Sequence, residues 1–594
     1  MPLGKHFIQD VAAPGEKLPE GYKSPVERAL KCMVDINPTL RLIESHKVVY
    51  NWPTKTDQVA LISGGGSGHE PAHVGFVGNG MLDVAVAGDV FASPSTAQIL
   101  VGLRTVESSK GTLMIVKNYT GDMLNFGAAA QKRRAEGHDV SVVIVNEDAS
   151  LDGGSMVGRR GLAGTIFVHK IAGAAAARGN TLDDVTRTAQ KVVDSMATVG
   201  VSLDRCSVPG RSGQEGLKSG EIEFGMGIHN EPGVLRADIG SLASTVTKVL
   251  EYLFSPTSPF PAPPTSDVSI PVAVLINNLG GLSSLELHVI AHEVLRQLSD
   301  KSPTLTVVRK YVGTFMTSLD GPGFSVTILK LDDELLPLLD DPTAAPSWPK
   351  PLPTDALPTS SRISKITDTA SQKPPFETPS SQVATLPSET WTSLTTALQS
   401  RIRSSEPQIT KLDTILGDGD CGTTLLKAAT AVHESFQASP ESSPPHIAAA
   451  LWQTAEAVSD SMGGTSGALY SIFLHSLAAN LRHASQTESL RAQIAKALRG
   501  SLDDLYKFTL ARTGDRTLMD ALIPFVNTFE QTGGDMAAAV SAAREGCEAT
   551  KRMEAKAGRA SYAKSEHAAG ESGVMDPGAL GLLCILEVLE EQFK

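Results

Sequence analysis

The stretch Gln58–His73, which reads QVALISGGGSGHEPAH, sets the pattern on which the fold prediction depends. It opens with a short apolar run of buried-strand type, and a polar loop with four glycines between Ser63 and His69 follows directly. Three further β-branched runs come later, and polar residues follow each of them: Asp83–Ala87, Leu113–Lys117 and Val140–Val145. Segments of helical length separate these runs. Strands that alternate with helices predict a parallel sheet that helices cover on both faces.

The chain continues with a second pattern of the same kind. Three more strand-like runs predict a second α/β subdomain: Pro271–Asn278, Leu305–Gly313 and Phe324–Leu331. A proline-rich break at 255–265 marks a candidate boundary between subdomains, and a long surface loop inside one domain explains it equally well. We therefore expect residues 1–340 to form one α/β lobe.

The composition changes at residues 341–380. Nine prolines, mixed with serine and threonine, fall between Pro342 and Pro379, and the apolar residues are too few to build a core. Such segments favour an extended polyproline geometry, so we expect a linker that lets two lobes move independently. After it, apolar residues from Trp391 to Ile402 recur at helical spacing, and alanine-rich stretches follow. Residues 381–594 are therefore predicted to form an all-α domain.

Composition and charge exclude several classes of protein. The 594 residues carry 52 basic and 65 acidic side chains, and the net charge of −13 disfavours binding to a nucleic-acid backbone. The five cysteines form no Cys-x-x-Cys pair, which fits neither a disulfide scaffold nor a structural zinc site. Charges and prolines occupy the amino-terminal residues, and no run of about 18 apolar residues occurs. We expect a cytoplasmic protein without a signal peptide or membrane span.

The ends of the predicted parallel strands form the first candidate site, because ligand crevices lie at the carboxyl ends of such strands. The glycines between Ser63 and His69 let backbone N–H groups approach a small oxygenated ligand, although a tight strand-to-helix turn needs glycines too. The loop lacks the lysine of a Walker motif, so ATP is not expected there. His69 can exchange protons near neutral pH, and Asp122 follows a later strand that ends at Lys117. Asp122 can instead cap the helix that follows it.

A further histidine, His229, lies between glycines in the stretch FGMGIHNEPG, close to Glu231. It is the third candidate in this half of the chain for proton transfer or for bonding to a ligand. A hydrogen-bonded turn histidine is the alternative, and the residues alone favour it.

Three carboxylates lie within eight residues in the segment KLDTILGDGDCGTT: Asp413, Asp418 and Asp420. Carboxylates so close raise one another's pKa unless a cation joins them, and Mg²⁺ or Ca²⁺ takes oxygen ligands of this kind. An EF-hand is excluded, because the twelfth position counted from Asp418 is Ala429 rather than glutamate. We expect magnesium, held partly open for phosphates, and a solvated acidic turn is the alternative.

Other loops in the helical half suit a nucleotide. The stretch SMGGTSGALY offers backbone amides and the hydroxyls of Thr465 and Ser466 at a helix start, where phosphates bind well. The stretch Met575–Ala579, MDPGA, fits a turn against a base. The stretch TGDRTLMDAL adds Arg516 and Asp520, for which an ordinary exposed helix start is the alternative. Together with the three aspartates, these loops predict a metal–phosphate site.

At these motifs the chain resembles the ATP-dependent dihydroxyacetone kinases, in the form that fuses the sugar-binding and nucleotide-binding parts. The resemblance runs through nearly the whole chain. It rests on GGGSGHEP, KNYTGD and GIHNEPG before the linker, and on LGDGDCG, GGTSGALY, GDRT with DAL, and DPGA after it. It implies an amino-terminal lobe that binds dihydroxyacetone and a carboxyl-terminal helical barrel that holds ATP with magnesium.

The resemblance also implies roles for individual residues. His229 would bind the ketone carbon covalently as a hemiaminal, while His69 and Asp122 would act as acid and base. The sugar pocket would be lined by Gly66, Ser67, Gly68, His69, Lys117 and Asp122. Magnesium would be held by Asp413, Asp418 and Asp420. The nucleotide would lie against Asp418, Gly419, Asp420, the backbone of Cys421, Thr465, Ser466, Gly514, Arg516, Asp576, Pro577 and Gly578.

The activity that the resemblance implies is phosphorylation of dihydroxyacetone, and of glyceraldehyde, with Mg-ATP, by a homodimer. A first alternative keeps the nucleotide site and changes the reaction, since some relatives split FAD into a cyclic flavin phosphate and AMP, often with manganese. A second alternative is a non-catalytic sensor or co-regulator that retains the fold.

Overall fold

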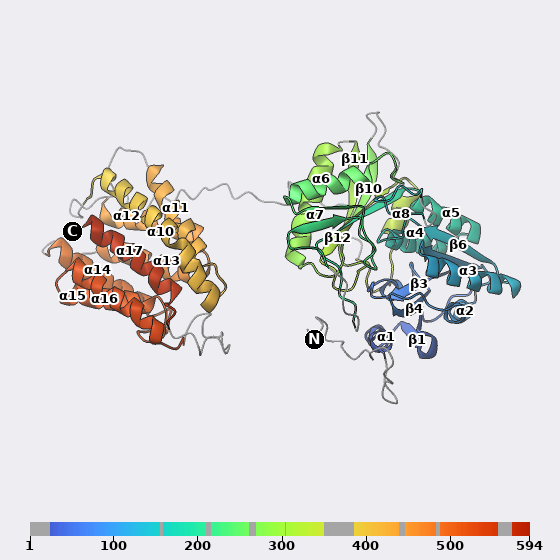
Figure 1. Ribbon diagram of the computed structural model, residues 1–594, viewed down its shortest axis with the longest axis horizontal. Helices are drawn as coiled ribbons and strands as arrows, with labels where there is room; N and C mark the ends of the chain where they lie inside the picture. The colour runs from blue at the N-terminus through green and yellow to red at the C-terminus, as the bar shows by residue number, and fades with distance from the viewer. Residues whose placement is uncertain are drawn as a thin grey trace. The chain divides into compact units, whose positions relative to one another are not determined.

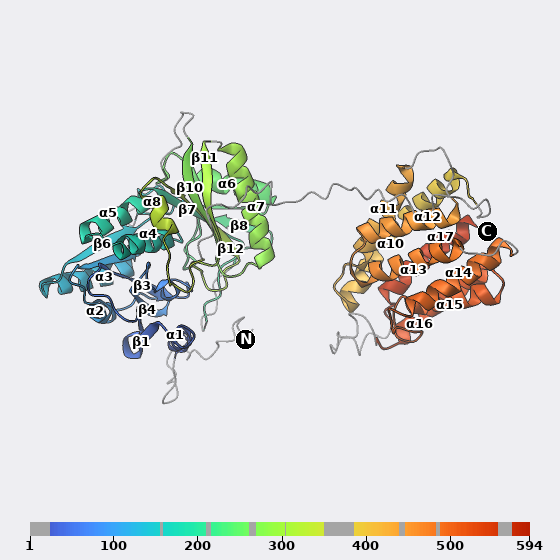
Figure 2. The same ribbon diagram turned by 180° about the vertical axis from the view of Figure 1, so that it is seen from behind.

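The computed structural model describes residues 24–154, 158–209, 216–260, 269–302, 304–349, 385–438, 446–482, 488–555 and 573–593. The chain separates into two compact units, Met1–Pro358 and Thr359–Lys594. The first unit, blue to green in Figure 1, contains strands and helices, and the described elements of the second, yellow to red, are all helices (Figure 1, Figure 2). The predicted α/β class of the first half and all-α class of the second are confirmed.

The first sheet has six strands in the order β1-β2-β4-β3-β5-β6. The strands are β1 (Leu40–Ile43), β2 (Val48–Asn51), β3 (Ala60–Ser67), β4 (Val84–Val90), β5 (Thr112–Lys117) and β6 (Val140–Val145). Strands β4, β3, β5 and β6 are parallel, as the sequence predicts. Strands β1 and β2, which form an antiparallel hairpin at one edge, were not predicted from the sequence.

The second sheet has six strands in the order β11-β10-β12-β7-β8-β9. The strands are β7 (Met196–Ser202), β8 (Glu221–Phe224), β9 (Leu235–Asp238), β10 (Ile270–Asn278), β11 (Leu305–Gly313) and β12 (Gly323–Lys330). Only β10 and β11 pair in parallel. Because β7 belongs to this sheet, the change from one sheet to the other comes before Met196 and not near 255–265. The described part of that break, up to Phe260, is a loop before β10.

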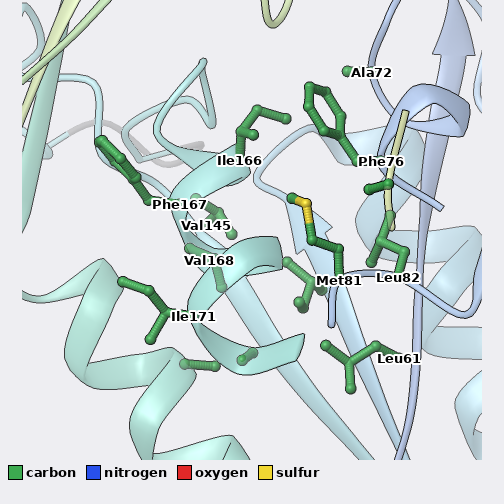
Figure 3. Packing of buried hydrophobic residues seen from close by; sticks show 14 of the residues in the cluster. Leu61, Ala72, Phe76, Met81, Leu82, Val145, Ile166, Phe167, Val168 and Ile171 are labelled. Carbon is green, nitrogen blue, oxygen red and sulfur yellow. The ribbon is translucent and has the colours of Figure 1, made fainter. Parts of the chain in front are cut away.

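Helices cover both sheets, and the largest core lies between the sheets. The helices of this unit are α1 (Pro25–Ile36), α2 (Thr96–Thr105), α3 (Thr120–Ala135), α4 (Thr165–Ala177), α5 (Leu182–Val193), α6 (Leu242–Leu253), α7 (Ser284–Lys301) and α8 (Leu335–Asp340), with short 3-10 turns η1 (Glu44–His46) and η2 (Val74–Phe76). Helix α4 is buried from Thr165 to Ala176, as expected for a helix whose residues are mostly apolar on every side. Figure 3 shows Ile166 and Ile171 of this helix among core residues that include Leu61 of β3.

Residues 341–349, which the composition assigns to the linker, pack against the α/β unit. Ala345 and Trp348 are buried, and the centroid of the Trp348 ring lies 4.8 Å from that of Tyr311. An indole ring gains from leaving water, which a count of prolines does not reveal. The rest of the predicted linker, residues 350–380, lies outside the described residues.

The second unit is a ring of helices. These are α10 (Ser388–Leu416), α11 (Cys421–Gln437), α12 (Ile447–Ser461), α13 (Gly464–Arg482), α14 (Leu490–Leu505), α15 (Met519–Gln531), α16 (Met536–Ala549) and α17 (Pro577–Gln592), with the 3-10 turn η3 (Thr550–Arg552). Each helix contacts the next, and α17 contacts α10. They surround a cavity of about 970 Å³ that is lined almost entirely by apolar side chains.

The helix order decides which loops of the second unit lie together. Successive helices of such a bundle run antiparallel, so the loops after α10, α12, α14 and α16 share one end of the ring. All the predicted nucleotide motifs lie in those four loops or in the helix starts that follow them. Within the described parts of the chain, no helix has the length and apolar character needed to cross a bilayer.

Candidate functional site

Strand β3 continues through the glycine run to Ser67, whereas the sequence analysis predicts a loop from Ser63. The reason is its close pairing with β4, since a Cβ on Gly64 would stand 2.2 Å from the carbonyl oxygen of Val86. The chain turns at Gly68, where φ is +105° and a Cβ would stand 2.8 Å from the ring of Phe91. This turn places the next residue, the predicted acid–base histidine, at the carboxyl end of β3.

His69 and His229 meet although they come from different sheets. His69 follows β3 and His229 lies between β8 and β9, and their Nε2 atoms are 3.0 Å apart. Nδ1 of His69 donates to the carbonyl of Thr317 at 2.8 Å. Nδ1 of His229 lies 2.9 Å from one carboxylate oxygen of Glu231, whose other oxygen accepts the backbone N–H of His229 at 2.8 Å. Because both Nδ1 atoms carry protons, the Nε2 contact needs one further proton between the rings.

Aromatic rings and buried charges surround this pair. The centroid of the His229 ring lies 4.7 Å from that of Tyr119 and 5.1 Å from that of Phe91, edge to face in both cases. Burial lowers the pKa of His69 well below its ordinary value, and the positive charges of Lys117 and His229 add to this. Burial acts to raise the pKa of Glu231, but its hydrogen bonds and its attraction to His229 outweigh burial and lower that pKa to about 2.

Lys117 and Asp122 lie at the floor of the same site. Lys117 ends β5 and is 1% exposed, and burial lowers its pKa while the charges of Asp122 and two glutamates act to raise it. Asp122 is buried in the first turn of α3, where a negative charge suits the helix dipole. Helix α3 has no side-chain cap, so Asp122 does not play the capping role that the sequence left open. A Cβ on Gly65 would stand 3.5 Å from Oδ2 of Asp122 and 3.6 Å from Cε of Lys117.

The remaining predicted pocket residues are tightly held. The hydroxyl of Ser67 donates to the carbonyl of Gly88 at 2.9 Å. A Cβ on Gly66 would stand 2.7 Å from the backbone nitrogen of Ala92. The serine hydroxyl is therefore occupied within the protein, and these positions can offer a ligand mainly their backbone and the space that a missing side chain leaves.

Several groups that line this site were not predicted from the sequence. Tyr119 lies inside the KNYTGD motif, directly after the strand, so its position was a usable signal. Phe91 follows β4 in the equivalent loop. Thr317 gives no local signal, because it lies 248 residues from the histidine that it contacts.

The three predicted metal aspartates converge between α10 and α11. One carboxylate oxygen from each of Asp413, Asp418 and Asp420 lies within 4.8 Å of the others. Asp413 is buried and accepts the backbone N–H of Cys421 at 2.9 Å, while the other two are exposed. The bend between them uses Gly419, whose φ is +78°. All three ligands are hard oxygen donors, and two of them face solvent. This set fits Mg²⁺, because the ion keeps several coordination positions for water and phosphate oxygens.

The predicted phosphate loops lie at helix starts on the same end of the ring. Thr465 and Ser466 stand in the first turn of α13, after Gly464 with a φ of +74°. The backbone N–H groups of such a turn and its hydroxyls are suited to phosphate oxygens. Cys421 begins α11, and burial, with the charges of Asp413 and Asp576, raises the pKa of its thiol to about 12. The nucleotide prediction for Cys421 therefore concerns its backbone and not its thiol.

The loop with Gly514 and Arg516 packs against the start of α17. Asp520 accepts the N–H of Gly514 at 2.6 Å, and Arg516 donates to the carbonyl of Val574 at 2.8 Å. Asp576 caps α17 by accepting the N–H of Ala579 at 2.8 Å, and burial raises its pKa to about 6. Two further predicted nucleotide residues, Pro577 and Gly578, form the first turn of this helix, and a Cβ on Gly578 would stand 3.5 Å from Leu518.

Both halves of the chain match family models, a Dak1 domain at residues 31–347 and a DAK2 domain at residues 415–591. A dihydroxyacetone kinase of Pichia angusta is 42% identical over 603 aligned residues, which cover 96% of this chain and 98% of that protein. The chain belongs to the dihydroxyacetone kinase family. The resemblance seen in the sequence motifs is thereby confirmed.

Two further members of the dihydroxyacetone kinase family bear on the sites. The triokinase/FMN cyclase of Mus musculus is 38% identical and covers 97% of this chain and 99% of its own. The crystal structure of the dihydroxyacetone kinase from C. freundii in complex with AMP-PNP and Mg²⁺ is 31% identical, with a TM-score of 0.60, and covers 97% of this chain and 100% of that chain. The Dak1 match contains both histidines of the first site, and the DAK2 match contains Asp418, Thr465 and Asp576, while Asp413 lies just before it.

Proposed function

We propose that the protein phosphorylates dihydroxyacetone with Mg-ATP, and that glyceraldehyde is a second substrate. The observation that carries this proposal is the partly buried contact at 3.0 Å between Nε2 of His69 and Nε2 of His229 in a member of this family. The names of the Pichia angusta and mouse relatives and the nucleotide in the C. freundii structure support it.

In the first step the ketone becomes a hemiaminal on His229. The Nε2 lone pair attacks the carbonyl carbon and forms a C–N bond, and the π electrons of the carbonyl move to its oxygen. That oxygen takes the one further proton that lies between the two Nε2 atoms, and the lowered pKa of His69 favours its release. Glu231 keeps Nδ1 of His229 protonated, so the lone pair stays on Nε2, and its carboxylate faces the positive charge left on the ring.

Covalent capture explains how the site can select its substrate. Glycerol resembles dihydroxyacetone in size and hydroxyl pattern, but it has no carbonyl carbon for His229 to attack. Discrimination by reactivity is therefore sharper than the discrimination that a few hydroxyl contacts supply.

In the second step a hydroxyl of the captured sugar attacks the γ-phosphate. Asp122 accepts the hydroxyl proton, and the nearby Lys117 offsets the buried negative charge. Asp413, Asp418 and Asp420 would hold magnesium, which supplies charge neutralisation for the triphosphate when it is bound. Thr465 and Ser466 contact phosphate oxygens.

The nucleotide also lies against other loops at this end of the ring. The loop around Gly514 and Arg516 and the turn Asp576–Gly578 border the remainder of the nucleotide. We include three broader features in the proposal: the ring α10–α17 is a closed barrel, the protein is a homodimer, and it works in the cytoplasm. The contact of α17 with α10 supports the first of these.

A coupled assay of ADP release tests the proposal. We expect Mg-dependent ADP release with dihydroxyacetone and with glyceraldehyde, and none above background with glycerol. Lack of ADP release with dihydroxyacetone would contradict a kinase and favour the sensor or co-regulator alternative. Turnover of glycerol would contradict selection through the carbonyl group.

A second activity is favoured by the name of the mouse relative, triokinase/FMN cyclase. We propose that the same nucleotide site splits FAD into a cyclic flavin phosphate and AMP, with Mn²⁺ as the preferred ion. Incubation with FAD and either Mg²⁺ or Mn²⁺, followed by chromatography for AMP, tests this. Asp418→Asn should abolish AMP formation, whereas His229→Ala should leave it intact. If AMP forms with neither Mg²⁺ nor Mn²⁺, the second activity is excluded.

A further inference from the structure

A second pair of buried histidines lies beneath the floor of the proposed sugar site. His73 comes shortly after β3 and is 5% exposed, and His169 lies in the middle of α4 and is fully buried. Nδ1 of His73 is 3.0 Å from Nε2 of His169 and 3.3 Å from the hydroxyl oxygen of Ser63. Figure 3 shows Phe167 and Val168, which precede His169 in α4, among buried apolar side chains. None of the steps proposed above uses this pair.

Both rings are neutral and therefore carry one N–H each. Burial lowers the pKa of His73 well below its ordinary value and that of His169 to about 3, and the charge of Lys117 adds to both effects. The contact at 3.0 Å then has two arrangements, since either ring can be the donor. Ser63 donates its hydroxyl proton to the carbonyl of Ile115 at 2.7 Å, so its oxygen offers Nδ1 of His73 only a lone pair. At 3.3 Å this long contact gives a weak preference for a proton on Nδ1.

The surroundings of the two outer ring nitrogens decide the arrangement. If His73 donated, His169 would carry its proton on Nδ1, which has no acceptor among the described residues. The bare Nε2 of His73 would also face the carboxylate side of the site. If His169 donates, its Nδ1 is an acceptor and His73 carries its proton on Nε2. Without a ligand, each arrangement leaves one buried N–H unpaired, on Nδ1 of His169 or on Nε2 of His73. A ligand acceptor at Nε2 of His73 pairs that N–H in the second arrangement only, so a bound ligand favours the second arrangement.

The N–H of His73 then points into the sugar site. Its Nε2 has no hydrogen-bond partner within the described part of the chain. It lies 3.6 Å from the point where a Cβ on Gly65 would stand, and Oδ2 of Asp122 lies 3.5 Å from the same point. A ligand hydroxyl near this point can donate its proton to Asp122 and accept the N–H of His73, which satisfies both buried groups.

We propose that His73 is a further substrate-binding residue, whose Nε2–H donates to the same sugar hydroxyl that donates to Asp122. His169 is a positioning residue, because it accounts for the position of the proton on His73. This inference rests on the proposed function, since it concerns the substrate of that site. It adds selection for a hydroxyl to the selection for a carbonyl, because an analogue with a methyl group there leaves two buried polar groups unpaired.

Two amide substitutions separate substrate binding from a structural role. Glutamine in His73→Gln places a donor close to the position of Nε2, and asparagine in His73→Asn keeps a polar atom at the position of Nδ1, next to His169. If His73 binds the sugar, His73→Asn raises the KM for dihydroxyacetone by roughly tenfold, the loss expected for one buried hydrogen bond, and His73→Gln changes it by less than about threefold. The KM for ATP stays constant in both. His292→Asn, at an exposed position on α7, is the control for the amide substitution.

The opposite order of KM values, equal effects of the two substitutions, or no effect of either overturns the inference. Gly65→Ala keeps it testable if the His73 variants fail to fold, since its Cβ makes only ordinary contacts of 3.5 to 3.6 Å with protein atoms and yet fills the ligand space. We expect an unchanged melting temperature and a loss of dihydroxyacetone binding, measured by calorimetry. Wild-type affinity in Gly65→Ala overturns the inference while leaving the kinase proposal intact. A wild-type protein that releases no ADP but still binds dihydroxyacetone refutes the kinase proposal alone.

Discussion

The two candidate sites differ in how much of each is formed by the protein alone. In the α/β unit His69, Lys117 and Asp122 are buried, while His229 is partly exposed. The two histidines of the proposed site are joined to Thr317 and Glu231 by hydrogen bonds. In the helical unit two of the three proposed metal aspartates are exposed, and the phosphate groups would meet helix ends. Buried polar groups must be paired before they are stable, whereas exposed carboxylates can wait for an ion. The proposed sugar site is therefore preorganised, whereas the proposed nucleotide site would be completed by its ligands.

The largest effect is expected when the proposed nucleophile, His229, is removed from the preorganised site. We expect His229→Ala to lower kcat/KM for dihydroxyacetone by at least about 10³-fold, because it removes the nitrogen proposed to form the C–N bond. Nucleotide affinity, measured with a fluorescent ATP analogue, should stay within about twofold of wild type. Turnover close to wild type would show that covalent capture has no part in the reaction.

At the exposed aspartate cluster of the helical unit we expect a large loss of activity without a loss of stability. Asp418→Asn should lower kcat by at least about 10²-fold at saturating sugar, since it removes a charged ligand for magnesium. Its melting temperature without ligand should match that of wild type, because the side chain is exposed. Asp460→Asn, an exposed aspartate on α12, is the matched control. A clear drop in melting temperature would mean that the aspartate cluster is structural.

A buried carboxyl of the α/β unit should instead affect stability in a pH-dependent way. Burial raises the pKa of Glu147 to about 7, so the folded state keeps a proton that the unfolded state has lost. Its contribution to stability is present below the unfolded pKa of about 4.5 and is lost as the pH rises towards 7. Relative to wild type, Glu147→Gln should therefore gain about 2 kcal/mol in the free energy of unfolding between pH 5 and pH 7.

Denaturant unfolding of the α/β unit at several pH values measures this change. Glu434→Gln on the exposed side of α11 should show no such trend. A constant difference between Glu147→Gln and wild type across this pH range would contradict the raised pKa.

The smallest effect is expected at Cys421. Burial raises the pKa of its thiol to about 12, and the contact with Asp413 is made by its backbone N–H. Cys421→Ser should therefore keep kcat/KM within about twofold of wild type, as measured by ADP release. A loss greater than tenfold would give the side chain a role at the metal loop.

The sequence predicts the parallel core of the first sheet and the helical second half well, because long periodic runs carry that information. It misses the four-residue strands β1, β2, β8 and β9, and it also misses β7, whose partner β12 is distant in the sequence. It also ends β3 at the glycine run, since glycine normally signals a turn. The close approach of β4 reverses that rule, because no residue with a Cβ fits beside Val86.

The candidate site was predictable where its residues lie in motifs. His69, Lys117 and His229 each stand beside glycines or at a predicted strand end. That His69 and His229 meet could not be predicted from the pattern, because they come from two sheets whose placement depends on the shared core. The tautomer of His69 depends on Thr317, which no motif contains.

Carbon NMR of dihydroxyacetone labelled at its carbonyl carbon, with stoichiometric protein and no nucleotide, tests the central claim most directly. The account predicts that the ketone resonance of bound sugar is replaced by a resonance of a tetrahedral carbon, and that His229→Ala abolishes this change. A bound sugar that keeps its ketone resonance in the wild-type protein would contradict covalent capture by the histidine pair.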